Sequence, residues 1–413
     1  MADHGYEGGR LDLPFVGIST FGKRPYVGDW SAVDADVAVL GAPFDFGTQW
    51  RPGARFGPRG VREASTLFSF GHAGAYDHED DAIYLPGDVR IVDIGDADIV
   101  HTDTVKSHAN IKAGVRAILA AGALPVTIGG DHSINIPCID AFDDQGDIHV
   151  LQIDAHLDFV DERHGVRFGH GNPMRRAAEK PYVTGLTQLG IRNVGSTAKE
   201  GYEDARARGS DILLVRQVRA LGPEATAARI PNGARIYITI DIDAFCPSIA
   251  PGTGTPSHGG FLYYDVLEIL QEVANRHDIV GIDLVEVAPD YDQSGSTTIL
   301  AAQVLLNLLG LIFHARGARR AGLGVAVIAP ALWHRIKAAL APGIAARDAL
   351  GREPATAQAA VLVKRLKGVL ATGRMIPAVI ADPGRQDQPI GPDRQRQQAR
   401  QRGHGAGCSF LSA

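Results

Sequence analysis

Apolar runs of four to six residues recur along the first three quarters of the chain, and segments of helical period separate several of them. The runs lie at residues 36–40, 124–128, 148–153, 186–191, 212–215, 236–240 and 279–282. Helical patterns occur between them, as at residues 104–121 and 264–276. Strands without a polar face are buried on both sides, and strands that alternate with helices pair in parallel. The pattern therefore predicts an α/β fold with three layers, in which helices cover both faces of a central parallel sheet.

The last hundred residues differ in composition from the rest of the chain. Of the 413 residues, 45% are hydrophobic and 21% are charged, which is typical of a globular protein. Residues 315–413 hold 16 Lys or Arg against 5 Asp or Glu, so they carry +11 and leave −17 on the preceding body, for a net charge of −6. We therefore predict a catalytic domain at residues 1–314 and a basic extension, rich in Ala, Arg and Gly, at residues 315–413.

Within the basic extension, helices are expected at residues 332–350 and 357–370, and disorder is expected at residues 385–402. A basic tail can contact nucleic acid or an acidic surface. This one lacks interleaved aromatic residues and any recognisable binding motif, so a dispensable or poorly ordered extension is favoured and no nucleic-acid partner is expected.

Cysteine usage and hydropathy indicate the compartment. Cys138, Cys246 and Cys408 are too few and too scattered for a disulfide framework, which favours a reducing environment. Residues 1–10 show no basic and then apolar signal pattern. The longest apolar stretch, residues 298–313, is short for a membrane span and contains two amide side chains, so it is expected to be a buried core helix. A cytoplasmic protein without a membrane partner is predicted.

Three short motifs at or just after predicted strands carry the candidate chemistry: GGDHS at residues 129–133, DAHLD at residues 154–158 and DID at residues 241–243. Together they offer four carboxylates and two imidazoles, from His132, Asp154, His156, Asp158, Asp241 and Asp243. The carboxyl ends of parallel strands share one edge of a sheet, so these groups would form an acidic cup that requires cations. Two divalent ions would balance four carboxylates, lower the pKa of a water and hold it beside an electrophilic carbon.

Each motif also has an ordinary structural interpretation. A lone Asp-x-Asp is common in turns and helix caps. GGDHS alone would suit a strand-to-helix turn in which the glycines adopt unusual dihedral angles and Ser133 caps the helix. Asp154, His156 and Asp158, however, share one face of an extended segment, and an apolar core would not tolerate them. The three motifs together favour a metal site.

The chain resembles the ureohydrolases, the arginase and agmatinase family. The motifs GGDHS, DAHLD, DIDAFCPSIAPGTGTP and GIDLVEVAPDYD occur in that family's order, and the similarity runs from about residue 37 to residue 313. The resemblance implies an arginase-like α-β-α fold, two Mn²⁺ or Ni²⁺ ions and hydrolysis of a small guanidino substrate to urea. It also implies a homo-oligomer, a trimer or hexamer, and gives the extension no role.

The resemblance also implies roles for individual residues. One ion would be held by His132, Asp154, Asp158 and Asp241, and the other by Asp154, His156, Asp241 and Asp243, so that Asp154 and Asp241 bridge. His170 corresponds to the family's proton shuttle and Glu286 to the carboxylate that binds the guanidinium; Asp158 is also counted as catalytic. Where the family usually has a third aspartate after Asp-x-Asp, this chain has Cys246, which leaves the order of that loop open. A packed thiol is favoured over a reactive or ligating one.

The substrate is less constrained. The segment at residues 159–168 lacks the polar pattern by which arginases bind the α-amino acid group, which disfavours L-arginine. Asp161 and Glu162 could attract the second cation of agmatine, whereas Arg163 and Arg167 could attract the carboxylate of a guanidino acid.

Residues 47–51 and 68–78 resemble the guanidine hydrolase branch, often nickel-dependent, and a bulky Trp50 near the cup would suit a very small substrate. The expected order is guanidine, then agmatine, then a guanidino acid, as in guanidinobutyrase. A non-catalytic partner of an active subunit is the remaining alternative.

Overall fold

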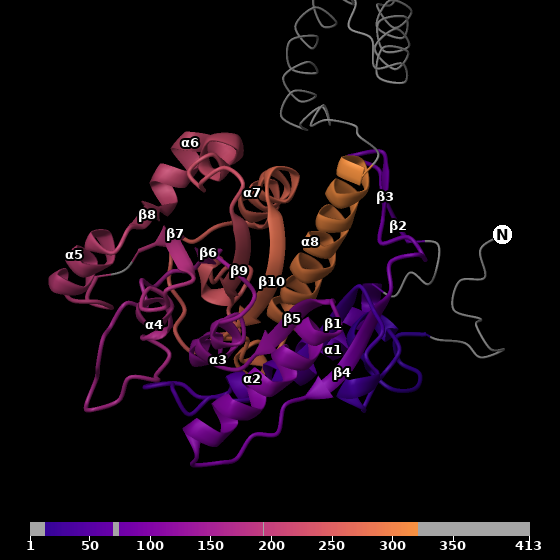
Figure 1. Ribbon diagram of the computed structural model, residues 1–413, viewed down its shortest axis with the longest axis horizontal. Coiled ribbons are helices and arrows are strands. Elements are labelled where there is room, and N and C mark those ends of the chain that lie inside the picture. Colours follow the sequence, from indigo (N-terminus) through magenta and orange to yellow (C-terminus); the bar gives the residue numbers. More distant parts are fainter. Residues whose placement is uncertain (1–12, 69–73, 193, 321–413) are drawn as a thin grey trace, which may run out of the picture. The chain divides into compact units, whose positions relative to one another are not determined.

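The computed structural model describes residues 13–68, 74–192 and 194–320. Its main element is a sheet of eight parallel strands in the order β4-β1-β5-β10-β9-β6-β7-β8 (Figure 1). The strands are β1 (Val37–Ala42), β4 (Ile91–Asp96), β5 (Leu124–Gly129), β6 (Ile148–Ile153), β7 (Val183–Ile191), β8 (Ser210–Leu214), β9 (Arg235–Asp241) and β10 (Asp278–Val285). A short antiparallel hairpin, β2 (Ala75–Asp77) and β3 (Ala82–Tyr84), stands apart from this sheet.

Helices cover both faces of the sheet. They are α1 (Gly57–Ser65), α2 (Thr104–Ala120), α3 (Asn135–Asp140), α4 (Pro173–Ala177), α5 (Lys199–Ala207), α6 (Val215–Ala227), α7 (Tyr263–Arg276) and α8 (Ser296–Arg320). Val37 and Val39 pack into a core with α1, α6, α7 and α8, whereas Ala38 and Leu40 pack with α2 and α3. Alternate residues of one strand thus feed two separate cores. The predicted three-layer α-β-α fold with a central parallel sheet is confirmed.

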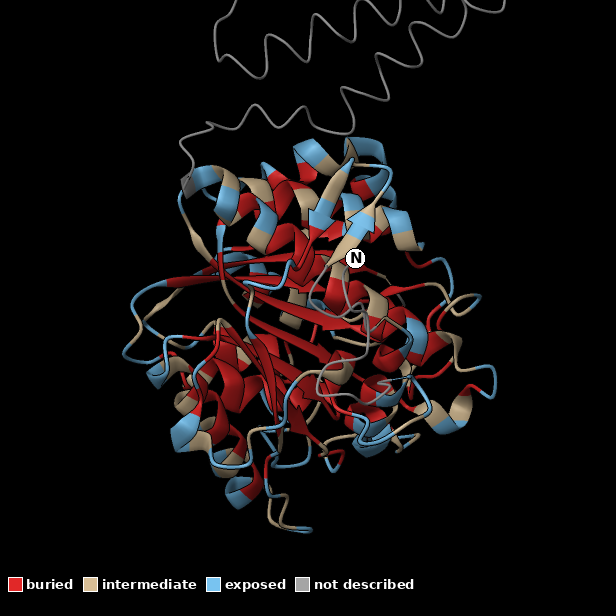
Figure 2. Ribbon diagram, turned by 90° about the vertical axis from the view of Figure 1, so that its right-hand side faces the viewer, coloured by how far each residue is buried: buried red, intermediate tan, exposed pale blue. Residues whose placement is uncertain are grey.

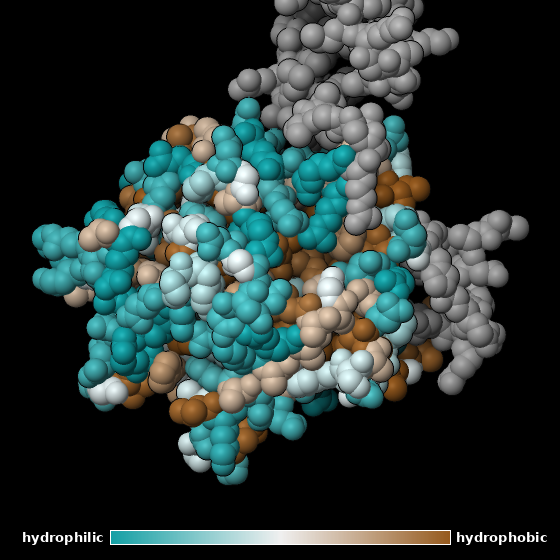
Figure 3. Space-filling model, in the orientation of Figure 1, coloured by the Kyte–Doolittle hydropathy of each residue, from teal (hydrophilic) through white to brown (hydrophobic). Residues whose placement is uncertain are grey.

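Exposure follows the same layers. In Figure 2 the strands of the central sheet are buried, while the helices expose their outer sides. The surface turned to the viewer in Figure 3 is mostly hydrophilic over the described residues. A sheet buried on both faces accounts for the uninterrupted apolar runs in the sequence.

The seven predicted strands all occur, but β4 and the hairpin were missed. β4 reads IVDIGD, and its buried Asp93 interrupts the apolar run. The Arg62 guanidinium compensates this carboxylate, with Nε 2.8 Å from Oδ2. The strand predicted at residues 212–215 ends one residue earlier, because Val215 is the first residue of α6. The ion pair that allows Asp93 to be buried joins residues 31 positions apart, so the local hydrophobic pattern could not predict it.

Helix α8 contains the long apolar stretch and begins two residues before it. Among the described residues it is the one helix that is long and apolar enough to cross a membrane, yet 72% of its most apolar window is buried inside the protein, where it packs against α1 and α7. The predicted domain boundary after residue 314 falls inside α8 and stays a prediction. Residues 1–10, Cys408, the tail helices predicted at 332–350 and 357–370 and the disorder predicted at 385–402 lie outside the described residues, as do residues 69–73.

Candidate metal centre and active site

The candidate site lies where four adjacent central strands end. β5, β10, β9 and β6 are neighbours in the sheet, and each is followed by one group of candidate residues. His132 opens a 3₁₀ turn after β5, Asp154 follows β6, Asp241 ends β9 and Glu286 follows β10. Because the strands are parallel, side chains far apart in sequence meet at one edge of the sheet.

The GGDHS turn depends on close packing more than on unusual dihedral angles. Neither glycine has a positive φ. A Cβ on Gly130 would lie 1.8 Å from the carbonyl oxygen of Phe44, so the end of β5 can approach the end of β1 only without a side chain. Asp131, not Ser133, caps the turn, since its carboxylate accepts a 2.9 Å hydrogen bond from the Ser133 amide.

Two groups of potential metal ligands share Asp154. The ligand atoms of His132, Asp154 and Asp241 lie within 4.8 Å of one another, and so do those of Asp154, His156 and Asp243. The structure thus brings together five of the six predicted ligands in two overlapping groups. The sixth, Asp158, is adjacent, with Oδ2 2.9 Å from Nδ1 of His132.

His132 provides a test of whether these residues suit a metal. Its ring is 1% exposed, and Nδ1 lies 3.1 Å from Asp154 Oδ2 and 3.5 Å from Asp241 Oδ2. Despite these distances, Nδ1 makes no hydrogen bond of acceptable geometry with any described residue. A buried imidazole nitrogen that faces three carboxylates without a directed partner suits a cation. The donor set of oxygen and nitrogen suits Mn²⁺ and related divalent ions.

The electrostatics indicate the same requirement for positive charge. Burial, together with repulsion from Asp158 and Asp243, raises the pKa of Asp154 to about 6. Burial would lower the pKa of His156, but Asp243, whose Oδ2 is 3.0 Å from Nδ1, raises it to about 11. Burial, together with repulsion from Asp243 and Asp154, raises the pKa of Asp241 well above its usual range. Without bound cations, the carboxylates draw protons to the histidines and to one another.

Glu286 and His170 form a second pair beside the ligand groups. Glu286 is 1% exposed, and its Oε1 accepts a 2.9 Å hydrogen bond from the His132 amide. His170 Nδ1 is 3.1 Å from the same oxygen. Burial alone would lower the pKa of His170, but Glu286 raises it to about 9. His170 is therefore an imidazolium at neutral pH.

Two candidate residues have left-handed backbones. Asp158 has a φ of 50° and Glu286 a φ of 64°. Such conformations are unfavourable for residues other than glycine and gather at functional sites. Both carboxylates contact His132: Asp158 Oδ2 lies 2.9 Å from its Nδ1, and Glu286 Oε1 lies 2.9 Å from its amide nitrogen.

Sequence reasoning missed the residues that support this site. Asp131 accepts a 2.7 Å hydrogen bond from the Gly47 amide, while the Gly47 carbonyl accepts one from the His170 amide. The Gln152 amide donates to Asp154 at 2.6 Å and Thr239 contacts His132 at 2.9 Å. Gln152 and Thr239 each stand two residues before a predicted metal ligand, so they share its face of the strand. Their polarity within apolar runs was the available signal.

The two other residues predicted to contact substrate, Trp50 and Asp161, have different surroundings. Trp50 is 69% exposed, with the Arg51 guanidinium carbon 5.3 Å from its ring centroid. Asp161 is paired with arginines: Arg176 Nη2 is 2.5 Å away and Arg167 Nη2 3.1 Å. The Arg176 hydrogen bond in particular lowers the pKa of Asp161, although burial opposes this slightly. Its charge is already compensated within the protein, which weakens the case for a substrate cation there.

The loop that carries Cys246 is ordered by an arginine. Arg192 donates to the carbonyl oxygens of Asp243 at 2.5 Å and Ser257 at 2.9 Å. Cys246 accepts hydrogen bonds from Ser248, which lower its pKa, and it belongs to neither ligand group found among the described residues. Loss of the family's third aspartate therefore leaves this loop held in place.

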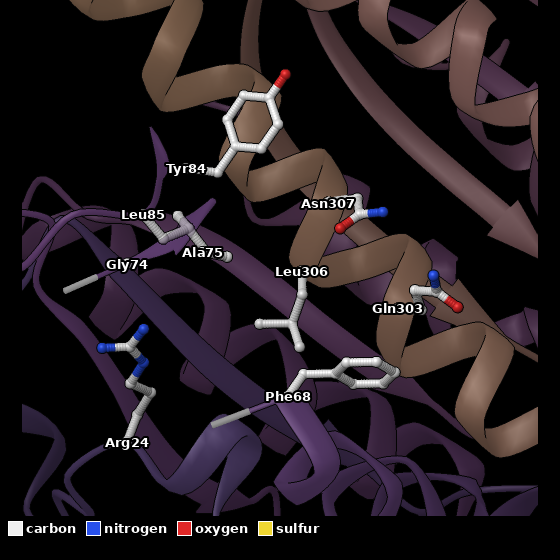
Figure 4. Close-up of a pocket in the computed structure, with 9 residues that line it drawn as sticks. All are labelled: Arg24, Phe68, Gly74, Ala75, Tyr84, Leu85, Gln303, Leu306 and Asn307. Atoms are coloured by element: carbon white, nitrogen blue, oxygen red, sulfur yellow. The ribbon is translucent and has the colours of Figure 1, made fainter. Parts of the chain in front are cut away.

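A separate cavity lies against α8. Figure 4 shows Gln303, Leu306 and Asn307 of this helix along one side, with Tyr84 and Arg24 among the other lining residues. None of its lining residues is a predicted ligand or catalytic residue.

Comparisons with known proteins agree with this geometry. A model of the arginase family matches residues 35–310. The chain is 35% identical to a guanidino acid hydrolase of Homo sapiens over 300 residues, 71% of this chain and 82% of the relative. It is also 35% identical to an agmatinase of Gallus gallus over 300 residues, covering 71% and 85% respectively. The structure of proclavaminate amidino hydrolase from Streptomyces clavuligerus aligns with a TM-score of 0.64 at 33% identity, over 73% of this chain and 99% of that one. The chain therefore belongs to the arginase family, and it is an amidinohydrolase, a hydrolase of carbon–nitrogen bonds in linear amidines.

Proposed function

We propose that this enzyme hydrolyses a guanidino group to urea, with ammonia or an amine as the second product, at a centre of two divalent cations. One cation would be held by His132, Asp154, Asp158 and Asp241, and the other by Asp154, His156, Asp241 and Asp243. The observation that carries the proposal is the buried Nδ1 of His132, which faces three carboxylates without a hydrogen-bond partner among the described residues. When bound, two such ions would activate a water for attack and stabilise the negative charge that develops.

Glu286 would bind and orient the substrate cation. Its carboxylate is almost completely buried and is already next to a cation, the His170 imidazolium, at 3.1 Å. The His132 amide donates to its Oε1 at 2.9 Å, and no hydrogen bond to Oε2 is found within residues 13–68, 74–192 and 194–320, so this oxygen could accept from a substrate. A planar guanidinium presents paired N–H groups that suit a carboxylate.

His170 would deliver a proton to the leaving nitrogen. Glu286 raises its pKa to about 9, although burial opposes this, so the imidazole carries the required proton at neutral pH. A second cation beside Glu286 would repel that proton, which favours its transfer once substrate is bound. The Gly47 carbonyl fixes the His170 backbone, and a Cβ on Gly47 would come within 3.0 Å of the His170 amide nitrogen.

We infer free guanidine as the first substrate to test, since the groups described above are sufficient to bind it. The contacts of Asp161 and Arg163 favour a guanidino acid over agmatine as the alternative substrate, which is the opposite of the order expected from the sequence. Asp161, which would attract the second cation of agmatine, is paired with Arg176. Arg163, which would attract a carboxylate, is hydrogen-bonded to the neutral side chain of Gln49. The similarity to a guanidino acid hydrolase supports the same alternative.

The test is urea release by the purified full chain, stripped of metal and reloaded separately with Mn²⁺ and with Ni²⁺. The substrates are guanidine, 4-guanidinobutyrate, agmatine and arginine. Activity on one of the first three is expected, and it should disappear in Asp154→Asn, because Asp154 belongs to both ligand groups. Two bound ions with no urea from any substrate would contradict the proposal and favour a non-catalytic partner. The expected cytoplasmic location and homo-oligomeric assembly stay predictions.

A further inference from the structure

A row of polar side chains crosses the middle of the sheet, directly below the candidate metal centre. Thr127 of β5 pairs with Asp283 of β10, Asp283 with Thr239 of β9, and Thr239 with Gln152 of β6. Each of these four residues is at most 1% exposed. Paired residues in neighbouring strands point to the same face, so the row forms one continuous polar layer. Polar groups at this depth are unfavourable unless each of them has a partner.

Asp283 is the charged member of this row, and three donors converge on it, two from β9 and one from α3. The Thr239 hydroxyl donates to Oδ1 through a short hydrogen bond. Asn135 Nδ2 and the Tyr237 hydroxyl donate to Oδ2, each at 2.8 Å. Burial raises the pKa of Asp283, while His132 and the three donors oppose the rise. This carboxylate faces none of the space assigned to substrate or cations, so the proposed chemistry does not explain it.

The hydroxyl of Thr239 links Asp283 to the metal site. Its oxygen is also 2.9 Å from Nε2 of His132. Because a hydroxyl has a single proton and Thr239 gives it to Asp283, the oxygen can only accept from His132. Nε2 therefore carries a hydrogen, and Nδ1 is the nitrogen left to face Asp154, Asp158 and Asp241. Without an acceptor at Thr239, nothing among these contacts would fix the ring in that orientation.

We propose that Asp283 is a positioning residue for the metal centre, which it acts on through Thr239 by holding His132 with Nε2 as donor and Nδ1 as ligand. Carboxylates and carbonyls that orient metal-binding histidines in this way commonly change metal affinity 10- to 100-fold when they are removed. Here a hydroxyl is inserted in the relay, which makes the proposal testable at two separate positions. The inference rests on the proposed two-cation function.

The rival explanation is that Asp283 only satisfies buried donors and stabilises the fold. The two explanations separate at Tyr237, since its hydroxyl donates to Oδ2 of Asp283, whereas the Thr239 hydroxyl donates to Oδ1. Tyr237→Phe removes a buried hydrogen bond from the same carboxylate but leaves the relay to His132 intact. It is therefore the matched control for Thr239→Val, which removes the relay and keeps the shape of the side chain.

The experiment compares metal binding by the full chain as wild type and as Thr239→Val, Thr239→Ser, Asp283→Asn and Tyr237→Phe. Each protein is stripped with chelator, titrated with Mn²⁺ by calorimetry and analysed for metal content, and the spin coupling of the Mn²⁺ pair is followed by electron paramagnetic resonance. Thermal unfolding in chelator measures the effect of each substitution on the metal-free fold.

We expect two ions per wild-type chain. In Thr239→Val and Asp283→Asn the affinity of one site should fall about 10- to 100-fold and the spin-coupled signal should be lost at limiting Mn²⁺. Thr239→Ser should restore both, and Tyr237→Phe should keep both even if its unfolding temperature falls as far as that of Thr239→Val.

Equal affinities in Thr239→Val and wild type, or equal losses in Tyr237→Phe and Thr239→Val, would overturn the inference and leave the proposed function standing. Failure of the wild type to bind two ions would instead overturn the proposed function itself.

Discussion

Replacing Glu286 with glutamine removes one buried negative charge and leaves the shape of the side chain unchanged. The amide oxygen of glutamine can still accept the 2.9 Å hydrogen bond from the His132 amide, so the turn after β10 should persist. Glu286 belongs to neither ligand group among the described residues, so both ions should still bind. The variant therefore isolates the contribution of this charge to substrate binding.

The magnitude follows from burial and distance. The Glu286 side chain is 2% exposed and has a cationic partner at 3.1 Å. At an effective dielectric constant of about 20, opposite unit charges at that separation attract by about 5 kcal/mol. Removing one member of a buried, hydrogen-bonded charge pair has a net effect of about 2 to 5 kcal/mol. This range corresponds to a loss in kcat/KM of about 30- to 5,000-fold.

The assay is steady-state urea release on the substrate that the wild type prefers, with the metal content of each preparation measured in parallel. Glu272→Gln is the matched control, because Glu272 is also buried but pairs with Arg276 on α7. It should retain wild-type kcat/KM. If Glu286→Gln binds two ions and keeps more than a third of the wild-type kcat/KM, Glu286 does not bind the substrate cation.

Three further predictions concern the proton donor, the fold and the metal. His170→Asn should bind both ions but lose about 100- to 10,000-fold in kcat, because it removes the acid beside the leaving nitrogen; an unchanged kcat at saturating substrate would refute this role. Arg62→Met should lower the free energy of unfolding by about 3 to 5 kcal/mol, since it leaves the buried Asp93 carboxylate uncompensated; urea denaturation measures the loss, and metal content should not change. Addition of Mn²⁺ at about 100 times its Kd should raise the free energy of unfolding by about 2.7 kcal/mol for each site; a thermal transition that is insensitive to Mn²⁺ and to chelator would count against a metal centre.

Most strands of the sheet could be predicted from the sequence because they are buried on both faces and therefore form apolar runs. Apolar runs need no partner to be recognised, and all seven predicted strands lie in the sheet. β4 was not predicted because the buried Asp93 interrupts its apolar run, and the Arg62 that compensates this carboxylate is distant in sequence. The hairpin of β2 and β3 was not predicted because only one of its six residues, Tyr84, is buried, so it shows no clear hydrophobic period.

The residues that support the site could be predicted from the sequence only in part. Thr239 and Gln152 could have been suspected, since each lies two positions before a predicted ligand on the same strand face. Asp283 and Asp131 could not, because their partners come from other strands and loops: Thr239 for the first and the Gly47 amide for the second. The pairing of Asp161 with Arg176 likewise required the folded loop.

The sequence by itself determined the layered α/β architecture, the strand ends at which chemistry gathers and the residue types available there. These properties depend on local period and on which side chains follow an apolar run, and both are written in consecutive residues. Only the tertiary structure decided which ligands share a space, which nitrogen of His132 faces the carboxylates and which charges are already neutralised by a neighbour. Those outcomes depend on strand order and register, which bring β5, β6, β9 and β10 to a common edge although about 160 residues separate the first from the last.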